Sequence, residues 1–159
     1  MKKSLISMIL LFLLFSIMIA PTSYTYATTP PFVPTVYVNK QKLNCDAFIA
    51  VTGVAMVSFR DIFTPFNMNV HWNQATQTVT ATTKDGSKTI VLTNAAQTVY
   101  INRKPLKVAQ APVIDGDILY VNLRVISESL EANVQFVKPS LNHGQYDVVA
   151  PSIYITTKQ

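Results

Sequence analysis

The chain has 159 residues and a formal net charge of +5, from 13 lysines and arginines against 8 aspartates and glutamates. Its basic residues are dispersed along the sequence, which argues against a nucleic-acid-binding stripe. A chain of this length can bury one core, or two small cores that share an interface. Cys45 is its only cysteine, so the composition also excludes an intramolecular disulfide.

The first 27 residues have the order of a secretory signal peptide. Lys2 and Lys3 precede an apolar run over residues 5–20, and small and polar residues follow up to Ala27. We predict cleavage after Ala27. An uncleaved membrane anchor is the alternative, because the run is only slightly short of the roughly 20 residues that span a bilayer. Both interpretations predict a secreted or extracellular protein, in which only an uncleaved signal segment would contact the membrane.

After a Pro/Thr-rich leader at residues 28–35, the sequence is repeated. Residues 36–43 (Val-Tyr-Val-Asn-Lys-Gln-Lys-Leu) return as residues 99–106 (Val-Tyr-Ile-Asn-Arg-Lys-Pro-Leu). Residues 57–60 (Val-Ser-Phe-Arg) return as residues 121–124 (Val-Asn-Leu-Arg). A period of this length indicates a repeated supersecondary unit.

This repeat predicts one domain over residues 36–157, made of two copies at residues 36–93 and 99–157. The few residues between the copies leave little room for a linker, so we expect one compact pseudo-symmetric domain. Whether the copies share one sheet or form two packed lobes stays open, as does the oligomeric state.

Each copy begins with a strand and a hairpin. Alternating residues at 36–39 and 99–102 predict half-buried strands that enter polar turns. Hairpins are expected about Gly53 and Gly116, because glycine supplies the positive φ that such turns require. Asp115 and Asp117 flank the second glycine, but the rest of a calcium loop is missing, so a turn is the better interpretation.

A short helix is expected after each hairpin. Ser58 and Asp61 resemble a capping box, and Asn122 is an equally suitable cap for the second helix. Apolar residues then recur at helical spacing, which predicts one buried stripe on each helix. Asn67 tolerates the left-handed conformation of a helix end, whereas Glu131 does so less easily, so we expect the second helix to end differently.

Strands follow the helices at residues 69–72 and 133–136, and the turn at residues 84–87 (Lys-Asp-Gly-Ser) predicts a further hairpin. The second copy diverges there. Residues 139–146 are expected to replace that short turn, before final strands at residues 147–150 and 152–157. Loops on rigid scaffolds often carry function.

These motifs resemble the copper amine oxidase N-terminal domain, or stalk domain, family. That family carries a Val-Pro-Leu-Arg sequence, a short helix that ends in Leu-Gly, then Val-x-Trp and a Thr-x-Thr-Val strand. The counterparts here are residues 57–60, 66–67, 70–72 (Val-His-Trp) and 76–79 (Thr-Gln-Thr-Val), with residues 121–124, 130–131 and 134–136 (Val-Gln-Phe) in the second copy. Both family prolines are replaced by residues that can cap a helix, and the glycine by Asn67 and Glu131.

The resemblance implies an α+β fold of mainly antiparallel strands with two short helices, one per repeat. It also implies a non-catalytic module, because in the namesake enzymes this domain is a stalk separate from the catalytic barrel. The copper site of those enzymes requires three histidines, and this chain has only His71 and His143. We therefore expect no catalytic residue, no metal and no cofactor.

Other chemistry-bearing residues have structural interpretations. His71 aligns with Gln135 and is expected to face solvent. Glu128 and Glu131 could act as a carboxylate pair, but a solvated helix face explains them better. Cys45 aligns with Val108, which favours a small apolar role in the core over a reactive or intermolecular thiol.

Basic residues are the candidates for ligand binding. Arg60 and Arg124 occupy equivalent places at the two helix starts, where they either contact an anionic ligand or tie each helix to nearby acceptors. A candidate surface combines the loop at residues 139–146 with a basic group. Its named members are Arg103, Lys104, Lys107, His143 and Tyr146.

The sequence thus predicts a secreted, non-catalytic binding or structural module that acts at the cell surface or cell wall. Its expected partner is a cell-wall polymer or an extracellular protein. The alternative is a protein–protein interaction module, either an inhibitor or a self-assembling subunit that pairs through an exposed sheet edge.

Overall fold

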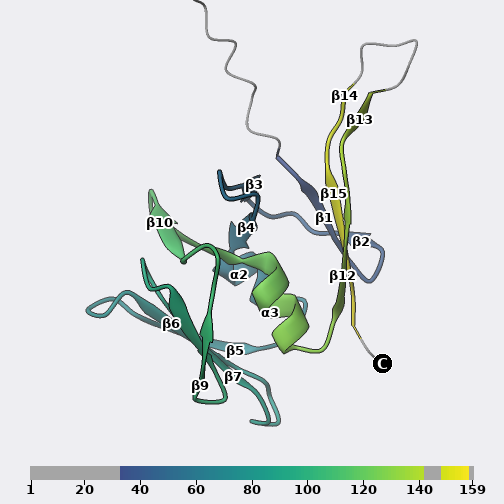
Figure 1. The fold of residues 1–159 in the computed structure, drawn as a ribbon. Helices are drawn as coiled ribbons and strands as arrows, with labels where there is room; N and C mark the ends of the chain where they lie inside the picture. The colour runs from purple at the N-terminus through teal and green to yellow at the C-terminus, as the bar shows by residue number, and fades with distance from the viewer. Residues whose placement is uncertain (1–32, 142–147, 158–159) are drawn as a thin grey trace, which may run out of the picture.

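The computed structural model describes residues 33–141 and 148–157 (Figure 1). In this part of the chain, strands dominate and two short helices lie between the sheets. Among the described strands, every pair is antiparallel except one. The predicted α+β class with mainly antiparallel strands is therefore confirmed.

The central sheet joins the two halves of the chain. Its strands, in spatial order, are β10 (Val113–Asp115), β11 (Ile118–Asn122), β4 (Ala55–Ser58) and β3 (Ala47–Ile49). Gly53 and Gly116 have φ angles of 77° and 59° in the two hairpin turns, as the sequence predicts. Strand β4 pairs with β11 so that Val57 lies opposite Val121.

The meander sheet follows the chain order. It consists of β5 (Asn69–Asn73), β6 (Thr78–Thr82), β7 (Thr89–Thr93), β8 (Thr98–Ile101) and β9 (Lys104–Lys107). Threonines alternate with buried apolar residues in β6 and β7, which places one face of the sheet on the core. The turn between β6 and β7 holds Gly86 at a φ of 71°, so the hairpin predicted about residues 84–87 is confirmed.

The closing sheet brings the two ends of the described chain together. Its order is β12 (Asn133–Val137), β15 (Ser152–Thr156), β1 (Thr35–Val38) and β2 (Gln41–Lys42). Strands β1 and β15 pair in parallel, with Val36 opposite Ile153. A short hairpin of β13 (Ser140–Leu141) and β14 (Val148–Val149) extends from β12 and β15 (Figure 1).

The strand registers correct the predicted place of the divergent loop. Asn133 lies opposite Thr156 in the β12–β15 pair, just as Asn69 lies opposite Thr82 in the β5–β6 pair. The insertion at residues 139–146 therefore occupies the place of the β5–β6 turn, not that of the turn at residues 84–87. In the described chain β1 takes the position beside β15 that β7 takes beside β6.

Helices α2 (Phe59–Phe63) and α3 (Leu123–Ser129) begin directly after β4 and β11. Their apolar stripes are buried, as predicted. The side chain of Asn122 accepts a hydrogen bond from the Val125 amide at 3.1 Å, which confirms it as a cap. The capping box at Ser58 is wrong: this residue is buried at the end of β4, and its side chain makes no capping bond.

Both helices end in the same way, contrary to expectation. Asn67 and Glu131 have φ angles of 54° and 62°. Their amides donate to Thr64 and Glu128 respectively, each at 2.9 Å. Glutamate thus adopts the left-handed conformation despite its side chain, because the chain must turn from α3 into β12 as it turns from α2 into β5.

One hydrophobic core lies between the helices and the sheets. Its largest fully buried side chains include Phe63, Met56, Ile62 and Ile126. Cys45 is half-buried and packs against this core, in agreement with its predicted apolar role. Among the described residues, no helix is long and apolar enough to cross a membrane.

Candidate functional site

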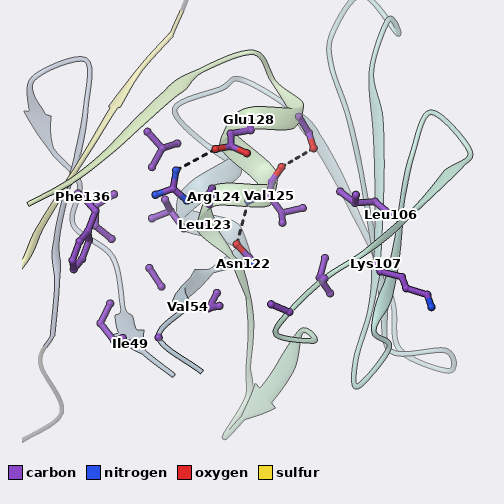
Figure 2. Close-up of a pocket in the computed structure, with 17 residues that line it drawn as sticks. Ile49, Val54, Leu106, Lys107, Asn122, Leu123, Arg124, Val125, Glu128 and Phe136 are labelled. Atoms are coloured by element: carbon purple, nitrogen blue, oxygen red, sulfur yellow. Dashed lines mark hydrogen bonds and ion pairs between the residues drawn. The ribbon is translucent and has the colours of Figure 1, made fainter. Parts of the chain in front are cut away.

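A groove of about 660 Å³ lies beside helix α3, between the closing sheet and strand β9 (Figure 2). Figure 2 shows Phe136 of β12 on one side and Leu106 of β9 on the other, with Leu123 and Arg124 between them. Phe136 and Leu106 are 41% and 42% exposed, unusually open for large apolar side chains. Further apolar lining comes from Ile49, Val54, Val134 and Ile153.

Charged groups lie on two walls of this groove. Arg124 Nη1 donates to Glu128 Oε1 at 3.2 Å, an i,i+4 pair on the exposed face of α3. Lys107 of β9 also lines the groove, but Figure 2 shows that its side chain is directed away from α3. The groove therefore offers apolar walls and the ion pair of Arg124 with Glu128.

A smaller pocket of about 260 Å³ lies beside helix α2. Several of its residues occupy positions that the predicted repeat aligns with the groove. Phe59 and Arg60 begin α2 as Leu123 and Arg124 begin α3, and Trp72 of β5 aligns with Phe136 of β12. Each pocket also receives the glycine turn of the other half's hairpin: Gly116 beside α2 and Gly53 beside α3.

Aromatic side chains pack against one another in the wall of the pocket beside α2. The Trp72 ring stacks on Phe59, with centroids 6.1 Å apart, and the Arg60 guanidinium lies 4.9 Å from the Phe59 centroid. The Trp72 indole nitrogen donates to Gln74 Oε1 at 2.7 Å. Beside α3, leucine replaces phenylalanine and phenylalanine replaces tryptophan. The groove beside α3 also has a wall at residues 106–109, whose counterparts do not line the pocket beside α2.

The structure separates the candidate ligand residues. Arg60 and Arg124 lie in different pockets, so they do not converge on one ligand. Lys107 lines the groove with Arg124, and Lys104 lies next to Leu106 on exposed β9. Arg103 lies in the β8–β9 turn with a φ of 65°.

The described strands that flank the predicted loop do not lie beside the basic group. Figure 1 places the β13–β14 hairpin, where that loop is inserted, and β9 at opposite ends of the molecule. His143 and Tyr146, the two candidates within the loop, lie outside the described residues. The remaining members of the candidate surface therefore belong to the groove side of the molecule.

The histidine and the two glutamates are exposed, as the sequence predicts. His71 is exposed on β5, and Glu128 and Glu131 are exposed and paired with Arg124 and Lys88. No group of metal-ligating side chains occurs in the described residues. Burial, with Asp61 and Asp46 nearby, raises the pKa of Cys45 from 9.0 to about 11, which disfavours its reactive thiolate.

Most of the groove could not be predicted from the sequence, because its walls come from segments far apart in the chain. Of its lining residues, the sequence singled out only Arg124 and Lys107 for binding. The available signal was a difference between the aligned copies: Leu123 against Phe59, and Phe136 against Trp72.

Comparison with known proteins identifies the family. The sequence-family model of the copper amine oxidase N-terminal domain matches residues 37–140, which is more than half of the chain. This domain is a non-catalytic module, and the match ends before β14 and β15. No curated protein and no solved structure matches the chain. The chain belongs to the copper amine oxidase N-terminal domain family.

Proposed function

We propose that this protein is a secreted, non-catalytic module that binds a partner at the cell surface or cell wall through the groove beside α3. The observation that carries this proposal is the apolar groove, whose walls include the half-exposed side chains of Phe136 and Leu106. Apolar walls with a few charged groups are typical of binding sites. The order of residues 1–27 supports export.

We also infer that the two halves are copies of one unit. The equivalent helix ends at Asn67 and Glu131, the facing residues Val57 and Val121, and the matching strand registers support this inference. In each unit, the helix and its pocket are completed by a hairpin from the other unit.

Co-sedimentation tests the proposed role. The protein lacking residues 1–27 is mixed with purified cell walls, with isolated glycan and with whole cells treated with protease, across a salt series. Binding that persists at high salt supports a specific surface-binding module. Binding that disappears as the salt concentration rises indicates electrostatic attraction alone. Loss of binding only after protease treatment identifies a protein partner. No binding in any arm would overturn the proposal.

A protein partner is favoured over a polysaccharide by the chemistry of the groove. A sugar presents many hydroxyl groups, and each one buried against Ile49, Val54 or Val134 would lose a hydrogen bond to water. A protein can present an apolar side chain that gains free energy from the same burial. This contrast supports the interaction-module alternative among surface-binding roles.

A further inference from the structure

We propose that Tyr37 and Tyr154 form an oxidative cross-linking site, at which the two rings are joined into one dityrosine. The oxidant is hydrogen peroxide, acting through a haem peroxidase. The site lies on the closing sheet, and neither tyrosine lines the groove beside α3. The inference therefore goes beyond the proposed binding role and does not depend on it.

The two tyrosines lie on the outer face of the closing sheet. Successive residues of a strand point to opposite faces. Val36 of β1 and Ile153 of β15 are each buried on the face that packs on the core. Their neighbours Tyr37 and Tyr154 therefore extend from the opposite face. Tyr154 is 39% exposed and Tyr37 is partly exposed, so an oxidant in solution can reach this pair.

The rings of these two tyrosines are stacked. Parallel pairing of the strands places Tyr37 directly opposite Tyr154. The ring centroids are 4.9 Å apart, and the ring planes differ by only 9°. Dityrosine forms between the ring carbons next to the hydroxyl groups. Because both rings extend from the same face of the sheet, rotation about their Cβ–Cγ bonds can bring these carbons into contact.

Backbone and side-chain bonds hold the strands in this register on both sides of the tyrosines. At one end, the Thr35 amide donates to the Pro151 carbonyl at 2.9 Å. At the other, the Asn39 amide donates to the Ile155 carbonyl at 2.9 Å. The Asn39 side chain also donates to Thr157 Oγ1 at 2.9 Å and accepts from the Thr157 amide at 3.0 Å. Two reactive groups held in contact react far faster than the same groups free in solution.

The coupling balances as a two-electron oxidation. Each phenol gives up one electron and its hydroxyl proton to become a tyrosyl radical, and the two radicals form one carbon–carbon bond. The hydrogen on each coupled carbon then moves to the neighbouring oxygen, which restores both aromatic rings and both hydroxyl groups. Hydrogen peroxide takes up the two electrons and two protons and is reduced to two molecules of water. The protein therefore loses two hydrogen atoms.

A cross-link at this site would join strands from the two ends of the described chain. Strand β1 begins at Thr35 and strand β15 ends at Thr156, so the bond would enclose nearly all of the described fold in one covalent loop. A covalently closed loop restricts the unfolded chain and thereby favours the folded state. The cross-linked protein should therefore resist denaturant better than the untreated protein.

Tyr100 shows that exposure alone does not create such a site. It lies on β8 and is 45% exposed, more than Tyr154. Within the described part of the chain, however, Tyr100 makes no contact with another aromatic ring. Tyr100→Phe is therefore the matched control, because it removes an accessible phenol and leaves the stacked pair unchanged.

The test treats the unsubstituted protein, Tyr37→Phe, Tyr154→Phe and Tyr100→Phe with a haem peroxidase and limiting hydrogen peroxide. Phenylalanine keeps the stacked ring but lacks the phenol, so the variants should remain folded. Monomers are isolated in denaturant, and their dityrosine fluorescence is measured. Fragmentation of the joined tryptic peptides by mass spectrometry locates the bond. We expect about tenfold less monomer dityrosine in Tyr37→Phe and Tyr154→Phe than in the unsubstituted protein or Tyr100→Phe.

Equal monomer fluorescence in Tyr37→Phe and the unsubstituted protein would overturn the site, as would joined peptides that map to other tyrosines. Dityrosine found only in covalent dimers would also overturn it. Treatment should raise the denaturant midpoint of the unsubstituted protein and leave that of Tyr37→Phe unchanged. Equal midpoints before and after cross-linking of the unsubstituted protein would overturn the stabilising role of the bond.

Discussion

Val57 and Val121 face each other across the β4–β11 pair, and both are fully buried. They are also the residues that the predicted repeat aligns, at the start of Val-Ser-Phe-Arg and Val-Asn-Leu-Arg. Because these aligned residues face each other in an antiparallel pair, a local twofold axis relates strands β4 and β11. The two halves of the chain thus meet at one of the segments that the predicted repeat aligns.

Shortening either valine should weaken the join between the halves. Val57→Ala and Val121→Ala should each lower the free energy of unfolding by about 2 kcal/mol, because each removes buried apolar contacts and leaves a cavity. Denaturant titration measures the change, and the double variant should depart from additivity because the residues are neighbours. Val70→Ala is the control, since Val70 is 40% exposed and should change stability little.

A glycine at position 131, after α3, should stabilise the fold. Glu131 has a φ of 62°, which is costly for a residue with a Cβ atom. Glu131→Gly should raise the free energy of unfolding by about 1 kcal/mol, less the small contribution of its exposed pair with Lys88. Asn67→Gly at the equivalent position should gain less, because asparagine tolerates this conformation. An equal gain at both sites in thermal unfolding would contradict this explanation.

Replacing Ser127 with alanine should stabilise the fold. Its hydroxyl is fully buried in α3 and has no hydrogen-bond partner in the described structure. Ser127→Ala removes this unsatisfied group and raises helix propensity, so the free energy of unfolding should rise by about 1 kcal/mol. Ser129→Ala is the matched control, because the Ser129 hydroxyl donates to the Val125 carbonyl at 2.6 Å. A larger gain at Ser129 would refute the argument.

Cys45 should react slowly and in a pH-dependent way. Burial and the nearby Asp61 and Asp46 raise its pKa to about 11, so little thiolate is present near neutral pH. Alkylation at pH 8 should be about tenfold slower than in the unfolded chain, since the lower thiolate fraction outweighs the higher nucleophilicity. Mass spectrometry of iodoacetamide-treated protein, with and without urea, measures both rates.

The same shift sets the sign of a pH effect on stability. The raised folded-state pKa means that the folded protein favours the protonated thiol. This contribution is fully present below pH 9 and is lost as the pH rises from about 9 to about 11. Cys45→Ala should therefore lose less stability across that alkaline window than the unsubstituted protein. Identical alkaline profiles would show that the thiol does not contribute.

Local signals in the sequence predicted local structure well. Gly53, Gly86 and Gly116 marked the hairpin turns, and Asn122 marked the start of α3, because turn and cap preferences act over a few residues. Burial of Ser58 within β4 overrode its capping preference. Tertiary packing likewise forced Glu131 into the conformation that its residue type disfavours.

Pairing over long distances could not be predicted in the same way. The β4–β11 and β1–β15 pairs join residues far apart in the chain, and their registers depend on all elements packing together. The sequence suggests that the loop at residues 139–146 replaces the turn at residues 84–87. The strand pairing instead matches β15 with β6, which places the loop at the position of the β5–β6 turn. The groove shares this origin, since α3, β9 and β12 form it only after folding.

The parallel pairing of β1 with β15 determines how the fold would carry mechanical load. Strand β1 begins at Thr35 and strand β15 ends at Thr156, so tension applied between the two chain ends pulls these strands along their axes in opposite directions. Their backbone bonds are then loaded in shear and must fail together, whereas a hairpin opens one bond at a time. A module anchored at one end and attached to a partner at the other would resist extension through this single strand pair.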